Sequence, residues 1–154
     1  ALGYRWSQNT SDTSNSNQVD IGGINDNNLT NKIHLNGGVD DNPSAWEAAG
    51  VIWGITQNNI TTVKFKNGNF DSLLNGVFSA NFKLQFSDNG ITWQDSGWTS
   101  VPTYNHDSPS AGGVTYTFIG PATSKIGVRV VGQVRTPGAL SWHVWAVELQ
   151  VFTD

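Results

Sequence analysis

His106, Asp107 and Ser108 carry the three side-chain types of a hydrolytic triad: a base, an orienting acid and a nucleophile. In a working triad these groups face one another in space, which three adjacent residues of one loop cannot do. The chain also contains no Gly-x-Ser-x-Gly nucleophile elbow. We therefore interpret residues 106–108 as a polar loop rather than as catalytic machinery.

Two other chemistries have as little support. The three histidines are far apart in the sequence and form no His-Glu-x-x-His motif, so no zinc site is indicated. Glycosidases need two carboxylates across a cleft. The carboxylates expected in loops are Asp40, Asp41, Glu47, Asp71 and Asp107. A domain of this size leaves little room for a deep cleft, so we predict that the chain is not an enzyme.

Composition narrows the class of partner. The 154 residues include only 13% charged side chains, a formal net charge of −4, seven tryptophans and no cysteine. Nucleic acids and anionic membranes attract basic patches, so both partners are disfavoured. No apolar run approaches the roughly 20 residues of a membrane helix. Without cysteine there are no disulfides and no thiol catalysis. A neutral polar partner fits this composition best.

The elements that must position any site are strands. Apolar and polar residues alternate over 51–55, 63–65, 82–87, 114–118, 126–130 and 145–151, which is the pattern of strands with one buried face. Asp88-Asn89-Gly90 is a turn that tolerates positive φ. Pro121 is expected to separate 114–118 from 126–131. No useful window has helical periodicity, so we predict one domain over 1–154, an all-β antiparallel sandwich.

The order of these segments resembles the discoidin, or coagulation-factor C-type, domain, and most of all the bacterial carbohydrate-binding modules of family 32. The resemblance covers nearly the whole chain. It rests on the turn at 35–39, Trp46, the strand at 51–55, the Ile-x-x-Val segment at 60–63, the Ser-Asp-Asn-Gly-x-x-Trp segment at 87–93, and the strands at 125–130 and 147–152. It implies a jelly-roll, galactose-binding-like fold.

The resemblance also implies a structural Ca²⁺, held in the family by a turn Asp, backbone carbonyls and a Glu of the final strand. This chain departs from the family at the turn, where Gly37 stands in place of the Asp. Asp40 and Asp41 could supply the missing oxygen ligands, and Glu148 matches the family Glu. The alternative is that Glu148 is a solvated residue on the polar face of its strand.

The aromatic residues divide into two groups. Those on alternating strand positions are predicted to pack in the core: Trp53, Phe82, Phe86, Trp93, Tyr116 and Phe118. Those in or beside loops are candidates for a ligand: Trp46, Phe70, Phe78, Tyr104 and Trp142. The alternatives are that Trp142 begins the core of the last strand and that Trp46 is structural. In family 32 the sugar site lies on loops at one end of the sandwich. By that resemblance the ligand-binding residues are Trp46, Glu47, Lys66, Asn69, Tyr104, His106, Arg135, Trp142 and His143.

The resemblance implies a non-catalytic module that binds a neutral polysaccharide, either an α- or β-glucan or a galactose-containing glycan. Its partners would be that glycan and a parent catalytic domain in the same polypeptide, a secreted bacterial glycoside hydrolase. The module is expected to be monomeric. Two alternatives remain: a discoidin-like cell-adhesion or protein-interaction domain, and a small polysaccharide-degrading enzyme.

Overall fold

The part of the chain that the structure describes forms eight β-strands. The structure, a computed structural model, describes residues 4–9, 33–35, 46–67, 78, 80–105, 114–133 and 144–153. The strands are β1 (Tyr4–Asn9), β2 (Ile33–Leu35), β3 (Trp46–Asn67), β4 (Ala80–Ser87), β5 (Gln94–Asp95), β6 (Ser100–Val101), β7 (Thr115–Gln133) and β8 (Val144–Thr153). Within these residues there is no helix long and apolar enough to cross a membrane.

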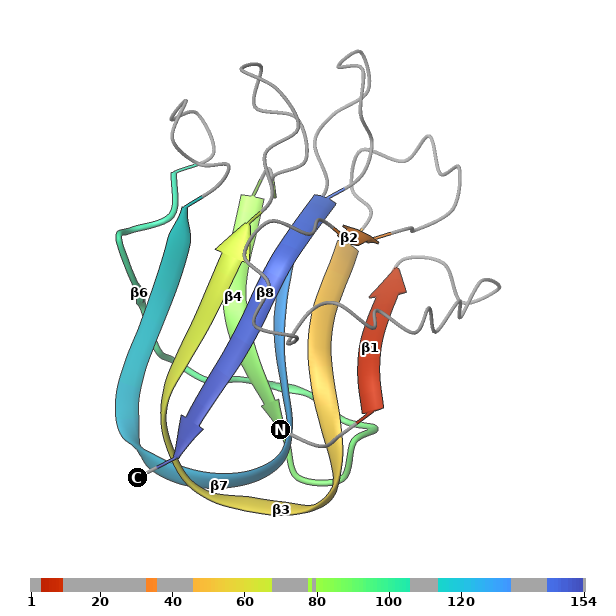
Figure 1. Ribbon diagram of the computed structural model, residues 1–154, viewed down its shortest axis with the longest axis vertical. Coiled ribbons are helices and arrows are strands. Elements are labelled where there is room, and N and C mark those ends of the chain that lie inside the picture. Colours follow the sequence, from red (N-terminus) through yellow and green to blue (C-terminus); the bar gives the residue numbers. More distant parts are fainter. Residues whose placement is uncertain are drawn as a thin grey trace.

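The strands form two antiparallel layers that share β3 and β7 (Figure 1). The first layer has the order β1–β3–β7–β4–β5 and uses the first part of β3 and the last part of β7. The second has the order β2–β8–β3–β7–β6 and uses the last part of β3 and the first part of β7. This arrangement is the antiparallel β-sandwich that the alternation predicts, in the jelly-roll form that the family resemblance implies.

Both shared strands bend where they pass from one layer to the other, at the bottom of Figure 1. Pairing between them continues through the bend, with Gln57 opposite Lys125 and Ile60 opposite Thr123, but the register shifts three times between Ile52 and Thr62. Asn59 lies there with a φ of 56°, which Asn tolerates better than most residues. We call this side of the sandwich the bend end. Because pairing persists through it, the prediction that Pro121 separates two strands is wrong.

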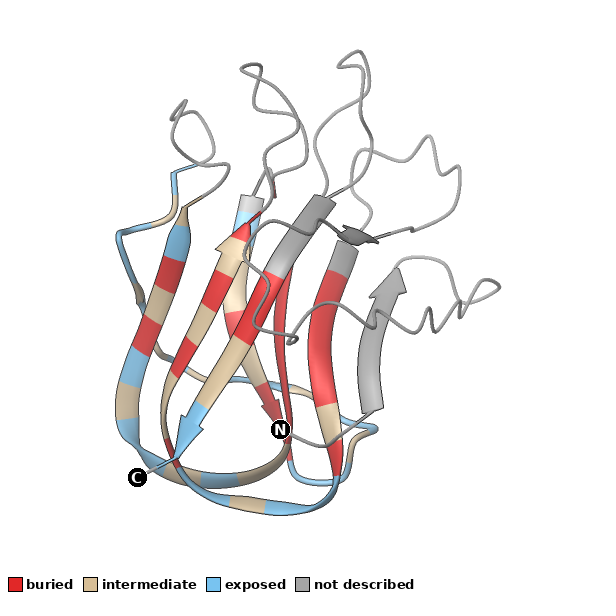
Figure 2. Cartoon of the chain, viewed as in Figure 1, coloured by how far each residue is buried: buried red, intermediate tan, exposed pale blue. Residues whose placement is uncertain are grey.

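The core fills the space between the two layers (Figure 2). Val51, Val128 and Leu84 face it from the first layer, and Phe65 and Leu149 from the second. The prediction of core positions is confirmed for Trp53, Phe86, Tyr116 and Phe118, which are all buried.

Phe82 and Phe78 lie together in an aromatic cluster. Phe82 is partly buried and contacts five rings with centroids 4.3–5.9 Å away, those of Phe65, Phe78, Tyr104, Tyr116 and Phe118. Phe78 has an exposed fraction of 0%, so its assignment to the ligand-accessible loop aromatics is wrong. Phe78 belongs to a segment rich in Gly and Asn, and this composition predicted a loop rather than a core position.

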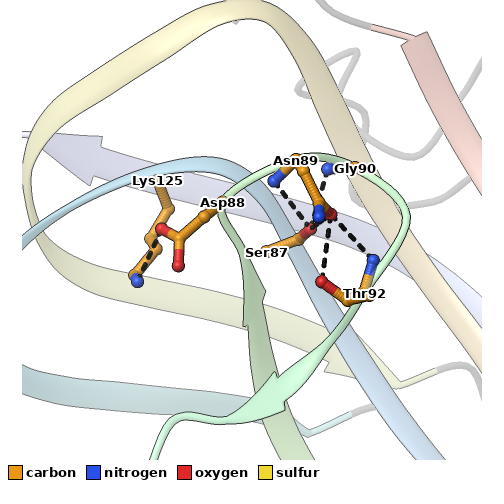
Figure 3. A network of polar contacts seen from close by, with 6 residues as sticks. All are labelled: Ser87, Asp88, Asn89, Gly90, Thr92 and Lys125. Carbon is orange, nitrogen blue, oxygen red and sulfur yellow. Dashed lines mark hydrogen bonds and ion pairs between the residues drawn. The ribbon is translucent and has the colours of Figure 1, made fainter.

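The turn after β4 is held by two side chains (Figure 3). Ser87 Oγ accepts hydrogen bonds from the backbone N–H groups of Asn89 and Gly90, at 3.3 and 2.8 Å. Asn89 Oδ1 accepts from the N–H groups of Ile91 and Thr92, both at 2.8 Å. Gly90 has a φ of +73°, which glycine adopts without strain. The Ser-Asp-Asn-Gly segment therefore makes the turn that the sequence predicts.

Trp93 directly follows this turn. It packs on the outer face of the first layer rather than in the main core. It is partly buried against the small cluster of Ala48 and Val131. The Arg129 guanidinium carbon lies 4.5 Å from its ring centroid, a cation–π contact. The prediction that Trp93 belongs to the main core is corrected accordingly.

A glycine on this outer face supports a first prediction. A Cβ added at Gly50 would meet the carbonyl oxygen of Val128 and lie 2.6 Å from Arg129 Cβ, whereas one added at Gly54 would meet nothing within 4 Å. Gly50→Ala should therefore force β3 and β7 apart and cost about 1–3 kcal/mol of unfolding free energy. Gly54→Ala, the matched control, should leave stability unchanged or raise it by about 0.4–1 kcal/mol. Urea denaturation followed by circular dichroism measures both, and equal stabilities would contradict the close approach at Gly50.

Candidate functional site

The predicted ligand-binding segments attach to strand ends that meet at one end of the sandwich, opposite the bend end (Figure 1). In the first layer, Trp46 and Ala80 both pair with Gln133, the last residue of β7. In the second layer, Lys66 pairs with Glu148 near the beginning of β8. We call this side the loop end. β3 and β7 end there, at Asn67 and Gln133, and the strands that follow them, β4 and β8, begin there.

The predicted site residues differ in how the structure places them. Trp46 and Glu47 are the first two residues of β3, at the loop end of the first layer. Lys66 is the second-last residue of the same strand and lies in the second layer. The residues that lie outside the described ranges are Asp40, Asp41, Asn69, His106, Arg135, Trp142 and His143. The assignment of these seven remains a prediction.

Glu148 is the described residue whose environment is most unusual. Its neighbour Leu149 faces the core, so Glu148 faces outward, yet only 3% of its surface is exposed. The alternative interpretation, a solvated residue of the polar face, is therefore wrong. Buried carboxylates are paired with a cation or coordinate a metal. Lys66, its register partner, places a positive charge on the neighbouring strand.

The described residues test the fit of a Ca²⁺ ion only in part. They contain no group of three or more acidic, His or Cys side chains that could hold a metal. Calcium takes six to eight oxygen ligands, and Glu148 could supply one or two of them. The remaining ligands would have to come from residues outside the described ranges, which include Asp40 and Asp41. The charge of Glu148 can thus be balanced either by Lys66 or by a bound cation.

Tyr104 joins two segments beneath the loop end. Its ring stacks on Phe82 at 4.3 Å, and its hydroxyl donates a 2.6 Å hydrogen bond to the backbone carbonyl of Phe78. Burial raises the pKa of Tyr104 well above its ordinary value of about 10, and burial also raises that of Tyr116. These contacts use the Tyr104 hydroxyl and much of its ring for packing. A ligand could therefore contact only the part of the Tyr104 ring that these packing contacts do not cover.

Two amide side chains that the sequence did not single out meet at the loop end of the first layer. Asn81 Nδ2 donates a 2.6 Å hydrogen bond to Gln133 Oε1. Asn81 has a φ of 55°, which explains the choice of Asn at this position. Asn81 lies at the beginning of β4, where the segment that follows Asn67 ends, and Gln133 lies at the end of β7, where the next segment begins. Amides both donate and accept, as sugar hydroxyls require.

No protein-family model matches the sequence, and no curated protein is similar to it in sequence. Its fold, however, is shared with solved carbohydrate-binding modules. One is the module CpGH89CBM32-5 from Clostridium perfringens, solved with GalNAc-β-1,3-galactose: TM-score 0.61 and 13% identity over 97% of this chain and 94% of that one.

Two further structures have the same fold. Chitosan-binding module 1 of a chitosanase/glucanase from Paenibacillus sp. IK-5 gives a TM-score of 0.61 and 17% identity over 97% of this chain and 93% of that one. The family 32 module of C. perfringens NanJ, solved with galactose, gives a TM-score of 0.58 and 13% identity over 96% and 90%. The resemblance to the discoidin-like family 32 fold is therefore confirmed, at the level of the fold.

The burial of Tyr104 supports a prediction about alkaline pH. Above about pH 10 an unfolded tyrosine ionises while the folded Tyr104 keeps its proton, so the folded state binds more protons and stability falls as the pH rises. The loss approaches about 1.4 kcal/mol per pH unit for one such group. In Tyr104→Phe the stability should fall less steeply between pH 10 and 11.5, and the remaining slope includes the contribution of Tyr116. Urea denaturation at each pH measures this, and equal slopes would contradict the buried state of Tyr104.

Proposed function

We propose that this chain is a non-catalytic carbohydrate-binding module that recognises a neutral polysaccharide or glycan at its loop end. The proposal is supported above all by the fold, which the chain shares over almost its full length with modules solved in complex with sugars. The ligand would be an α- or β-glucan or a galactose-containing glycan.

The described part of the loop end offers groups of the right chemistry. It presents the Asn81–Gln133 amide pair, and the aromatic cluster around Phe82 and Tyr104 supports the strands beneath it. Its described charged residues include Glu47, Lys66 and Glu148, and the last two are register partners of opposite charge. The predicted contacts outside the described ranges, Trp142 and His143 above all, would add a stacking ring and a further polar group.

We further propose that the chain acts as a monomer attached to a secreted bacterial glycoside hydrolase. One of the structures with this fold is a module of a chitosanase/glucanase, which supports such an attachment. In that role the module would keep the catalytic domain at the surface of its substrate. Linking a binding domain to an enzyme raises the effective concentration of substrate without any new catalytic group.

Native affinity electrophoresis through gels containing soluble starch, β-glucan or galactomannan tests the proposal. We expect retardation in at least one gel, and the retardation should persist at physiological salt because neutral contacts are not screened. A several-fold loss of affinity with added salt would indicate an ionic ligand. Absence of retardation in every gel would favour the protein-interaction alternative. Release of reducing sugar or of unsaturated products would favour the enzyme alternative.

Trp142→Ala tests the site itself. If the ring stacks on a sugar, its loss should cost about 1–3 kcal/mol by analogy with base stacking on aromatic side chains, or roughly 5- to 150-fold in affinity. The gel that retards the wild-type protein measures this, and far-UV circular dichroism checks that the variant is folded. Normal binding by a folded Trp142→Ala protein would show that the segment 134–143 does not carry the site.

Chelation tests the cation. If Ca²⁺ balances the buried Glu148, a chelator should lower the melting temperature of the wild-type protein, because a ligand of the folded state stabilises it. Glu148→Gln should melt at a lower temperature and should no longer respond to the chelator. If the melting temperature is the same with added Ca²⁺ and with the chelator, no Ca²⁺ stabilises the fold, and Lys66 is the described cation that remains to balance Glu148.

A further inference from the structure

A cavity with the chemistry of a ligand site lies away from the loop end. It is a groove of about 450 Å³ between the segment 94–98 and the bend of β7, where Pro121 and Lys125 form the opposite wall. Phe86, which lies at its base, is six residues along β4 from Ala80 at the loop end. At 3.3 Å per residue the two are about 20 Å apart. The groove is therefore separate from the end of β4 that lies at the loop end.

One wall of the groove is the indole of Trp98, held in a fixed orientation. The ring meets Phe86 edge-on, with centroids 5.1 Å apart and an interplanar angle of 81°. It also lies directly against Gly120, where even one Cβ would collide with it. The backbone N–H of Trp98 donates to Ser96 Oγ at 3.0 Å, and Gly97 makes the turn with a φ of 72°. Trp98 is a half-buried residue that lines the groove, so part of it is open to a ligand.

Polar groups beside the ring are placed to bind hydroxyls. The exposed amide of Gln94 and the indole N–H of Trp98 make no hydrogen bond with any residue that the structure describes. Asp95 is fixed by Lys83 Nζ on Oδ2 at 2.8 Å and by Gln85 Nε2 on Oδ1 at 2.7 Å. The hydrogen bonds from Lys83 and Gln85 lower the pKa of Asp95, so the carboxylate is ionised at neutral pH. Each of its oxygens retains capacity to accept another hydrogen bond.

The charges around the groove favour a neutral occupant. Lys83 is paired with Asp95, and Lys125 is paired with Asp88 Oδ1 at 2.8 Å (Figure 3). These two cations and two carboxylates cancel. The nearby guanidinium of Arg129 is buried, donates to Gln85 Oε1 and does not line the groove. A charged ligand would have to compete with one of these pairs, whereas a neutral ligand with hydroxyl groups can bind between them. An aromatic wall beside donors and acceptors matches the apolar face and hydroxyl rim of a pyranose ring.

We propose that this groove is a second carbohydrate-binding site, in which a neutral sugar residue stacks on Trp98 and donates hydroxyl hydrogen bonds to Gln94 and Asp95. This inference rests on the proposed function, since it adds a second contact with the same class of ligand. A site at each end of the sandwich would let one domain hold two strands of a polysaccharide or two points on one chain. The avidity of such binding exceeds the affinity of either site.

The variant Ala122→Gln tests the groove without touching the core. Ala122 is exposed and lines the groove, so the larger side chain should block it. Ser124→Gln is the matched control, because Ser124 is exposed two residues along the same bend and is not part of the groove lining. Trp98→Phe serves to assign the Trp98 indole signal in ¹H–¹⁵N spectra. The probe is whichever of soluble starch, β-glucan or galactomannan retards the wild-type protein.

In the wild-type protein the Trp98 indole signal should shift as the polysaccharide is added. Ala122→Gln should abolish this shift and lower the affinity about 5-fold or more, the cost of a lost stacking contact, while Ser124→Gln should behave as the wild type. If the wild-type protein binds but its Trp98 signal does not move, or if Ala122→Gln leaves the shift intact, the second site is refuted and the proposed function stands. If the wild-type protein binds none of the three polysaccharides, both proposals fail.

Discussion

The continuous pairing of β3 with β7 is the constraint on which the rest of the structure depends. Each strand contributes one part to the first layer and the other part to the second, and the two remain paired through the bend. A strand that crossed alone between layers would leave backbone donors and acceptors unpaired near the core, which is costly. Because the two strands cross together, some of these groups pair within the bend, at Gln57 opposite Lys125 and Ile60 opposite Thr123, and the register shifts absorb the change in direction.

This shared bend also determines at which end of the sandwich connecting segments of variable sequence can attach. The bend end is closed by paired backbone, whereas β3, β4, β7 and β8 all begin or end at the loop end. Segments that leave a rigid frame at one end can change in sequence without disturbing the core, which is why binding functions gather on such segments. The Tyr104–Phe78 hydrogen bond and the ring stack on Phe82 strengthen the frame beneath them.

Polar side chains on the outer face of the first layer both stabilise the strands and orient a carboxylate at the groove. Arg129 packs on Trp93 and donates from Nε to Gln85 Oε1 at 2.7 Å, and Gln85 in turn donates to Asp95. Burial lowers the pKa of Arg129 to about 10, which still leaves it charged at neutral pH. This chain of contacts fixes the carboxylate at the edge of the groove. The same outer surfaces thus stabilise the layers and orient groups that a ligand could reach.

Much of the fold could be predicted because it depends on local alternation. The predictions of strands over 82–87, 126–130 and 145–151 are confirmed, since a half-buried strand needs an apolar residue at every second position. Pro121 was misread as a boundary because proline usually interrupts a sheet, but it is tolerated in an irregular bend. Phe78 was misread because it lies between polar and glycine-rich residues, and its burial depends on rings from distant strands.

The sequence by itself determined the strands, the turn after Ser87, the class of fold and the expectation of a neutral ligand. These follow from residue types and from spacing over a few positions. Only the tertiary structure decided that Glu148 is buried, that Trp93 covers an outer face, and that Trp98 meets the bend of β7. Trp98 and Gly120 are far apart along the chain, and they meet because β7 bends across the end of the sandwich. No local sequence pattern predicts this contact, since it depends on the path of the whole strand.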